Sequence, residues 1–170
     1  GMVDLSEQDS ILTVKKGNMT VLFDRQKGIL TSIDFGSGNI LQKGITPNFW
    51  RAPIDNDFGF KMPQKLGAWK KATQHAKLTS VTAEETASAY IIRTEHILTD
   101  VKDAVVELQY IIFYSGRIEI DMDLEEVKGD LPMLPRFGTN FIIDPAFDQI
   151  EWYGRGPHEN YQDRKTSALI

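Results

Sequence analysis

The stretch MTVLFDRQKGILTSIDF at residues 19–35 decides the fold, because it contains two runs of strand-forming side chains around a short polar segment. β-Branched and large apolar residues favour extended backbone, and glycine supplies the positive φ that a tight antiparallel connection needs. Gly28 stands at the end of the polar segment 24–28. The stretch therefore predicts a β-hairpin. A second turn at 36–38 and a short run at 39–42 extend it into an antiparallel meander.

The rest of the chain repeats this strand pattern. Turn-forming Gly, Asp, Pro or Lys residues separate five further candidate strands, at 77–83, 88–98, 104–114, 117–127 and 136–143. Short strands at such intervals are typical of an all-β antiparallel sandwich. The segment 63–72 is the one candidate helix, since Leu66, Trp69 and Lys70 could share a face there. We therefore expect at most one short helix.

Strict alternation appears in RIEIDMDLEE at 117–126, where isoleucine, methionine and leucine alternate with Glu and Asp. Alternation with period two predicts a strand with one buried and one solvated face. A metal site on the acidic face is the less favoured alternative, because side chains two apart on a strand stand parallel rather than converging on a cation. The run at 110–114 is apolar without alternation, which predicts an interior strand covered on both faces.

Composition narrows the class of protein. The 170 residues carry a net charge of -5 and no cysteine. An acidic chain lacks the excess of Lys and Arg that binding to nucleic acid or an anionic membrane requires. The absence of cysteine removes disulfides and thiolate sites and is compatible with cytosol or periplasm. No apolar run approaches the roughly 20 residues of a membrane span. Gly1 ahead of Met2 resembles a tag scar, so we expect 1–10 to be tag remnant and linker.

Signatures of hydrolase nucleophiles, zinc proteases and phosphate loops are missing from the sequence, and we expect no cofactor or metal in this chain. Two stretches nevertheless combine aromatic rings with bidentate polar groups, NFWRAPIDNDFG at 48–59 and EWYGRGPHENYQDR at 151–164. Sugar sites use this pairing, with rings stacking on C–H faces and polar groups bonding hydroxyls. Structural locking of long loops is the competing interpretation, and we favour it.

Four segments together resemble a known family. WRAPIDNDFG at 50–59, LPRFG at 134–138 and WYGRGPHENYQDR at 152–164 resemble, in this order, the C-terminal domain of bacterial β-galactosidases of glycoside hydrolase family 2, and FDRQKGIL at 23–30 looks like the opening hairpin of that domain. The resemblance implies a sandwich of the galactose mutarotase-like supersandwich type. In that family the domain continues past the last motif, with several more strands and a late tryptophan. We therefore expect 11–170 to be the N-terminal part of the domain, and the sandwich to be incomplete.

The resemblance also implies roles for particular residues. The family's two catalytic glutamates lie in a separate (β/α)₈ barrel, so no catalytic residue is expected here. The loop with Arg51, Asp55, Asn56, Asp57 and Gly59 looks like the family's mobile loop at the active-site mouth, with Gly59 suited to a hinge. Residues that could face sugar or lock the second motif are Trp152, His158, Glu159, Asn160, Tyr161, Asp163 and Arg164.

Structural interpretations stand beside these roles. Arg51 paired with Asp55 and Asp57 would lock the base of its loop, and Trp50 would belong to the core. Trp152 and Tyr153 are expected to pack at the end of a strand. Expected partners are the upstream barrel and sandwich domains of the same parent chain and a β-galactoside. Self-association through unpaired strand edges, with partial disorder over 150–170, is expected of the isolated chain.

Two other functions stay open from the sequence. An aldose 1-epimerase on the same sandwich would need a His and a Glu across a sugar ring, and His75, His96 and His158 are the available histidines. His158 next to Glu159 is the one suggestive pair, although sequence neighbours tend to point apart. A stand-alone carbohydrate-binding or packing module is the other alternative.

Overall fold

Ten strands and three short helices make up most of the described chain, residues 3–125 and 128–154, in a computed structural model of the protein. In chain order the elements are β1 (Asp4–Gln8), β2 (Ile11–Lys16), β3 (Met19–Asp24), β4 (Ile29–Asp34), β5 (Leu41–Asn48), α1 (Asp55–Phe60), α2 (Met62–Lys65), α3 (Ala68–Lys71), β6 (Lys77–Glu85), β7 (Ala89–Leu98), β8 (Ala104–Phe113), β9 (Ile118–Glu125) and β10 (Gly138–Ile143).

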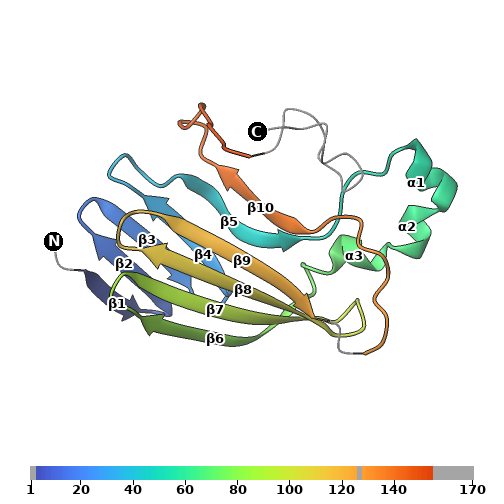
Figure 1. Cartoon of the computed structure of the whole chain (residues 1–170), viewed down its shortest axis with the longest axis horizontal. Helices are drawn as coiled ribbons and strands as arrows, with labels where there is room; N and C mark the ends of the chain where they lie inside the picture. Colours follow the sequence, from blue (N-terminus) through green and yellow to red (C-terminus); the bar gives the residue numbers. More distant parts are fainter. Residues whose placement is uncertain (1–2, 126–127, 155–170) are drawn as a thin grey trace.

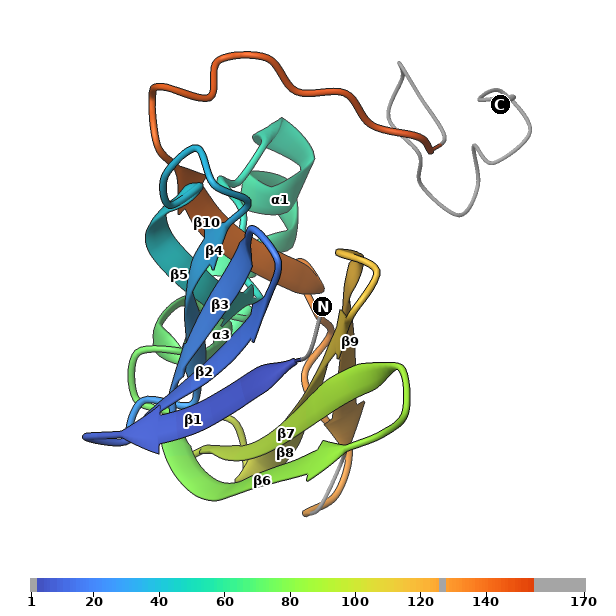
Figure 2. The same ribbon diagram turned by 90° about the vertical axis from the view of Figure 1, so that its left-hand side faces the viewer.

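The strands form two facing layers. One layer holds the sheet β1-β2-β3-β4, and the pair β5-β10 extends it beyond β4 (Figure 1). The other layer is the sheet β6-β7-β8-β9, which faces the first (Figure 2), and the three helices lie at one end of the sandwich (Figure 1). Each paired strand runs antiparallel to its neighbour. The prediction of an all-β antiparallel sandwich is confirmed, while its assignment to the mutarotase-like type stays a prediction.

The predicted hairpin at 19–35 is confirmed as β3 and β4, which pair with Asp24 opposite Ile29. The carboxylate of Asp24 accepts a hydrogen bond from the backbone N–H of Lys27 at 3.0 Å and closes the turn. Gly28 has a φ of +64°, a conformation in which L side chains are strained. The short alternation of apolar and polar residues and the glycine thus fix both the strands and their connection.

The structure differs from the sequence-based expectations in two segments, residues 4–8 and the helical region. Residues 4–8, expected to belong to a linker, form β1 and pair with β2. The segment 63–72 is helical as expected, but it forms two short helices, α2 and α3, and α1 precedes them, so the expectation of at most one helix is wrong. The segment DNDFGF of α1 contains weak helix formers, so its intrinsic preference gave no helix signal. Hydrogen bonds from the side chain of Arg51 to Asp57 hold this helix in place.

The core lies between the layers. The ring of Phe23 on β3 meets the ring of Tyr110 on β8 edge-on, with centroids 5.3 Å apart. At the helical end, Trp69 on α3 contacts Phe49 at the same centroid distance of 5.3 Å. Both contacts join elements far apart in the sequence, and edge-on ring pairs contribute beyond the area they bury. The two aromatic pairs therefore tie the layers together and anchor the helices.

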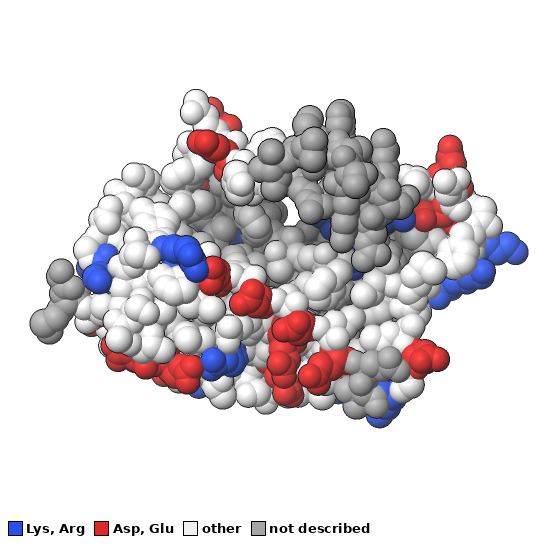
Figure 3. Space-filling view, viewed as in Figure 1, with Lys and Arg blue, Asp and Glu red and all other residues white. Residues whose placement is uncertain are grey.

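Strand β9 follows the predicted alternation. Its apolar side chains pack against the core, and its acidic side chains lie on the outer face of the sheet, where acidic groups gather (Figure 3). β8 is an interior strand of the sheet, as predicted, with Tyr110 and Ile112 buried. Coverage of both its faces is not observed in the described chain, since Ile111 and Phe113 are only half-buried on the outer face. The guanidinium of Arg117 covers part of the Phe113 ring at 4.5 Å.

None of the helices in the described residues has the length and apolar character needed to cross a membrane.

Candidate functional site

The first motif, residues 48–59, leaves the end of β5 beside β10 and continues into α1 (Figure 1). Asn48 fixes its start, because its side-chain oxygen accepts a hydrogen bond from the N–H of Trp50 at 3.2 Å. The amide nitrogen of Asn48 also reaches Asn140 on β10 at 3.4 Å. Trp50 itself is half-buried and packs against the core, in line with its expected place there. The motif therefore begins on a fixed base.

Arg51 clamps the loop that follows. Its two terminal nitrogens donate to the two carboxylate oxygens of Asp57 at 2.5 and 2.9 Å, a bidentate fork. Its Nε donates to the carbonyl oxygen of Pro135 at 3.1 Å. Asp57 in turn accepts a hydrogen bond from the N–H of Ile54 at 2.9 Å, as an acidic residue in the first turn of a helix commonly does. The predicted lock is confirmed for Arg51 with Asp57.

Electrostatics reinforce this clamp. The hydrogen bonds from Arg51, and next the one from the N–H of Ile54, hold the pKa of Asp57 below its ordinary value. The carboxylate is therefore charged under neutral conditions, and its pairing with the guanidinium is maintained.

Asp55 and Asn56 are not part of the clamp. Both side chains are exposed, and neither has a hydrogen-bond partner among the described residues, so the expected pairing of Asp55 with Arg51 is not formed there. Ile54 and Phe58 are 57% and 61% exposed on the same short segment. The clamped loop thus presents two polar and two apolar side chains to its surroundings.

The backbone conformation at the end of α1 was compared with the hinge expected at Gly59. Gly59 lies inside α1, and a Cβ there would meet no atom within 4 Å. The left-handed residue that ends the helix is Lys61, with a φ of 59°. A non-glycine residue in this region is strained. The backbone break between α1 and α2 therefore falls two residues after the glycine, while a hinge role for Gly59 stays a prediction.

Replacing Arg51 with lysine is expected to loosen the loop. Lysine keeps the charge but cannot form the bidentate fork or the third bond to Pro135. We expect amide exchange at residues 54–58 to accelerate by about tenfold or less, because the pair is partly exposed. Hydrogen-exchange mass spectrometry checks this. Arg93→Lys on the outer sheet face is the matched control, and equal exchange in both variants would contradict the clamp.

The segment 130–137, which contains the first four residues of the LPRFG motif, is held by its backbone carbonyl groups. Arg51 binds the carbonyl oxygen of Pro135, and the indole N–H of Trp69 donates to that of Pro132 at 3.2 Å. The ammonium group of Lys102 binds the carbonyl oxygen of Asp130. Two motifs about 84 positions apart in sequence therefore meet at one place. The sequence contained no signal for this contact, because a carbonyl acceptor is common to every residue.

The second motif is described only in part. Trp152 and Tyr153 are 71% and 89% exposed and belong to no strand, so the expectation that they pack at a strand end is wrong. A tryptophan usually indicates a core position, but no described helix or strand lies against Trp152. The remaining candidates of this motif lie outside the described residues: His158, Glu159, Asn160, Tyr161, Asp163 and Arg164.

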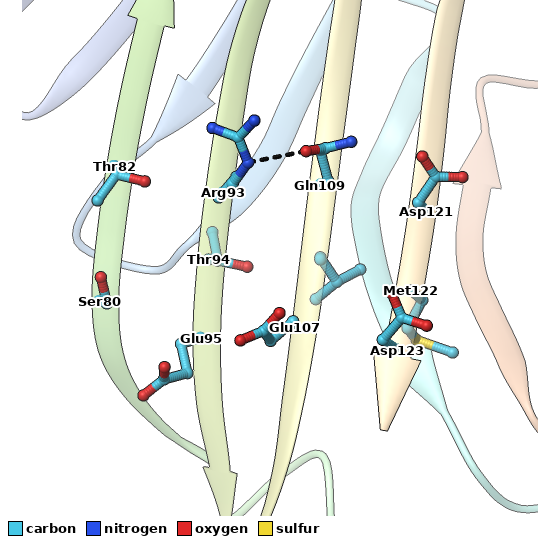
Figure 4. A pocket seen from close by; sticks show the side chains of 11 residues that line it. Ser80, Thr82, Arg93, Thr94, Glu95, Glu107, Gln109, Asp121, Met122 and Asp123 are labelled. Atoms are coloured by element: carbon cyan, nitrogen blue, oxygen red, sulfur yellow. Dashed lines mark hydrogen bonds between the residues drawn. The ribbon is translucent and has the colours of Figure 1, made fainter. Parts of the chain in front are cut away.

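A shallow hollow of about 520 Å³ lies on the outer face of the β6–β9 sheet. Arg93 donates to Gln109 at 2.8 Å across its upper row, and below it Glu107 and Asp123 occupy paired positions on adjacent strands, with the Glu107 carboxylate turned toward Glu95 (Figure 4). Within the described chain, no group of three or more His, Cys, Asp and Glu is arranged to hold a metal ion. The acidic side chains of Asp121, Asp123 and Glu125 are exposed on this face.

The two described histidines have different surroundings. Nδ1 of His75 lies 2.6 Å from the carboxylate of Asp100 at the surface. His96 on β7 points into the sandwich, and its Nδ1 is buried without a hydrogen-bond partner in the described chain. Burial lowers the pKa of His96 below its ordinary value of 6.5. Neither histidine forms the His–Glu pair that an epimerase would need.

The pKa of His96 predicts how stability varies with pH. In the folded chain the buried imidazole binds a proton only below its ordinary pKa of 6.5, whereas in the unfolded chain it binds a proton as the pH falls through about 6.5. Stability is therefore full above 6.5 and falls as the pH drops below it, because only the unfolded state gains the proton. Urea unfolding at about pH 7.5 and about pH 5.5 should show a lower midpoint in acid. His96→Phe should show a smaller drop, and an equal drop would contradict the assignment.

Comparison with known proteins identifies the family. The sequence profile described as "Beta galactosidase small chain" matches residues 15–170. The chain is 38% identical over 168 residues to a β-galactosidase of Priestia megaterium, covering 99% of this chain and 16% of that protein. It is 30% identical to a β-galactosidase of Halalkalibacterium halodurans, covering 100% of this chain and 17% of the relative. A β-galactosidase of Streptococcus thermophilus is 28% identical over 99% of the chain.

The chain spans about a sixth of the length of these curated relatives. The parent proteins of this family thus contain other domains besides the sandwich. The family match covers β3 to β10, the clamped loop and the segment 130–137, so it rests on most of the described fold rather than on one motif, while β1 and most of β2 precede it. The chain belongs to the β-galactosidase small chain family.

Proposed function

We propose that this chain is a non-catalytic module of a retaining β-galactosidase and that it borders the active-site mouth formed by another domain. The observation that carries the proposal is the match of residues 15–170 to a domain of β-galactosidases about six times longer than this chain. In this proposal the substrate is a terminal β-galactoside, and the barrel and sandwich domains of the same parent chain are the partners. The remaining domains supply the catalytic carboxylates.

The clamped loop is the part that faces the substrate. Arg51 and Asp57 are engaged with each other, so their role is to hold the loop. Asp55 and Asn56 are exposed and retain their hydrogen-bonding capacity. A carboxylate can accept hydrogen bonds from sugar hydroxyls, and an amide can both accept hydrogen bonds from them and donate hydrogen bonds to them. The exposed Phe58 supplies an apolar surface against the neighbouring domain, which also favours the packing role over a stand-alone module.

A catalytic pair within this chain is the rival explanation. Retaining glycosidases use two carboxyl groups about 5–5.5 Å apart. Glu107 and Asp123 stand directly opposite on neighbouring strands, where Cβ atoms are about 4.5–5.5 Å apart. Both side chains are exposed on an open sheet face. An acid/base residue of this mechanism needs an enclosed environment that keeps it protonated, so this pair does not meet the requirement.

Hydrolysis of a chromogenic β-galactoside tests the proposal. The 170-residue chain alone is expected to be inactive, whereas the same segment joined to the rest of its parent chain is expected to be active. Within the assembled enzyme, Asp55→Asn should lower kcat/KM, by about tenfold if one charged hydrogen bond to the substrate is lost. Asp148→Asn makes the same change at an exposed position outside the loop and is the control. Activity of the chain alone that disappears in Glu107→Gln would overturn the proposal.

The isolated chain is also proposed to self-associate. β10 ends its sheet in the described chain, and its Phe141 and Ile142 side chains are exposed. Unpaired strand edges with apolar side chains template further pairing. Light scattering should give an average mass that rises with concentration, and Phe141→Lys should reduce it. A constant monomer mass would contradict this part of the proposal.

A further inference from the structure

A second hollow, of about 380 Å³, opens between the two layers of the sandwich. The turn between β3 and β4 forms its rim, and side chains of β5, β7 and β8 form its floor. The apolar side chains of Ile29, Ala76 and Leu78 line its wall and are half-buried, and below them the floor residues Ile45, Leu98 and Val106 are 4%, 1% and 0% exposed. The hollow therefore reaches the core, and its volume falls in the range of roughly 300–1,000 Å³ that small-molecule sites occupy.

The rim carries no uncompensated charge. Lys27 stands at the rim, and its ammonium group lies 3.6 Å from the carboxylate of Asp24. The interior of the hollow is lined by uncharged side chains and by His96. Burial keeps the pKa of His96 low, so its ring is neutral near pH 7. A neutral ligand therefore matches the hollow better than an ion, since desolvating an ion would not be offset.

Most polar groups inside the hollow already have partners. The hydroxyl groups of Thr73 and Thr46 donate to the carbonyl oxygens of Pro47 and Asn140 at 2.9 and 3.4 Å. The ring of His96 differs, because its Nδ1 is buried without a partner among the described residues. Its Nε2 edge faces Gly28, where an added Cβ would lie 3.1 Å from that nitrogen. Glycine at this position adds no side chain beside the ring edge, and Cδ1 of Leu78 lies 2.7 Å from the same added Cβ.

We propose that this hollow binds a small neutral molecule that has an apolar body and one hydroxyl group. The apolar body packs against Ile29, Ala76 and Leu78, and the hydroxyl exchanges a hydrogen bond with Nε2 of His96. Apolar pockets with one or a few convergent polar groups are the usual form of small-molecule sites. This site is separate from the clamped loop, so it does not depend on the proposed β-galactosidase role.

Phenol and toluene are suitable probes, because they share a ring and differ by a hydroxyl. We expect each to give saturable methyl chemical-shift changes at Ile29, Ala76 and Leu78 of the 170-residue chain. Phenol should bind about fivefold more tightly than toluene, the effect of one net hydrogen bond. Absence of saturable changes, or changes confined to other methyl groups, would overturn the proposal.

Two variants separate the apolar and polar contributions. Ala76→Phe fills part of the hollow and should abolish binding of both probes, whereas Ala146→Phe makes the same change at an exposed position and should leave binding intact. His96→Phe keeps an aromatic ring of similar shape without nitrogen atoms. It should retain toluene and lose the preference for phenol. A preference that persists in His96→Phe would overturn the assigned hydrogen bond, even if Ala76→Phe failed to fold.

Discussion

Replacing Trp69 with alanine is expected to lower the free energy of unfolding by about 3–5 kcal/mol, the usual cost of removing a buried large aromatic side chain. Trp69 is 1% exposed, and its ring contacts Phe49 with centroids 5.3 Å apart. No polar group replaces the indole N–H that binds the carbonyl oxygen of Pro132. The variant therefore loses the core contact and the tie to segment 130–137 together. Urea unfolding followed by circular dichroism measures the loss.

Trp69→Phe is the matched control. It retains most of the apolar ring and removes the indole donor, so we expect a loss of about 1–3 kcal/mol as Pro132 loses a buried partner. Amide exchange in segment 130–137 should accelerate in both variants. If Trp69→Ala unfolded at the same urea concentration as the wild-type chain, the helices would not depend on this contact for their place on the sandwich.

Phe23→Ala is expected to have an effect of similar size, about 3–5 kcal/mol, at the centre of the sandwich. Phe23 is 1% exposed and meets Tyr110 of the opposite layer edge-on at 5.3 Å. Truncation leaves a cavity between layers that stay apart because their own hydrogen-bonded sheets are intact. The ring of Tyr110 then loses its partner across the interface. Denaturant unfolding should show a single transition at a lower midpoint.

Phe23→Leu separates the ring contact from burial. Leucine keeps most of the apolar area, so the remaining cost should be about 0.5–1.5 kcal/mol, the contribution of an aromatic pair beyond its area. A loss equal to that of Phe23→Ala would mean that shape rather than area decides the packing here. A Phe23→Ala variant as stable as the wild-type chain would contradict the assignment of Phe23 to the core between the layers.

The elements that sequence predicted best are those with local signals. The alternation in 117–126 specified both the strand β9 and the face that it buries, and the polar segment before Gly28 specified the hairpin. β1 was missed because DLSEQ contains one large apolar residue and lies mostly exposed at the sheet edge. α1 was missed because hydrogen bonds to the Asp57 carboxylate from Arg51 and from the N–H of Ile54, rather than helix propensity, hold its first turn.

The candidate site was predictable to a similar extent. Arg51 with Asp57 was a reasonable pair because the two residues are close in sequence and chemically complementary. The link from Arg51 to the carbonyl oxygen of Pro135 was not predictable, since it depends on how the two layers and the helices bring separate segments together. Trp152 shows the opposite error, because a large aromatic residue suggests burial only when another element lies against it.

The attachment of segment 130–137 through its carbonyl oxygens has a consequence for how this family can change over time. A carbonyl acceptor is present whatever the side chain, so substitutions at Met133, Leu134 or Arg136 would leave the three hydrogen bonds available. The segment can therefore diversify its outward-facing side chains without detaching from the sandwich. A randomised library at these three positions should yield mostly folded variants, which makes the segment a natural place for new surface properties to arise.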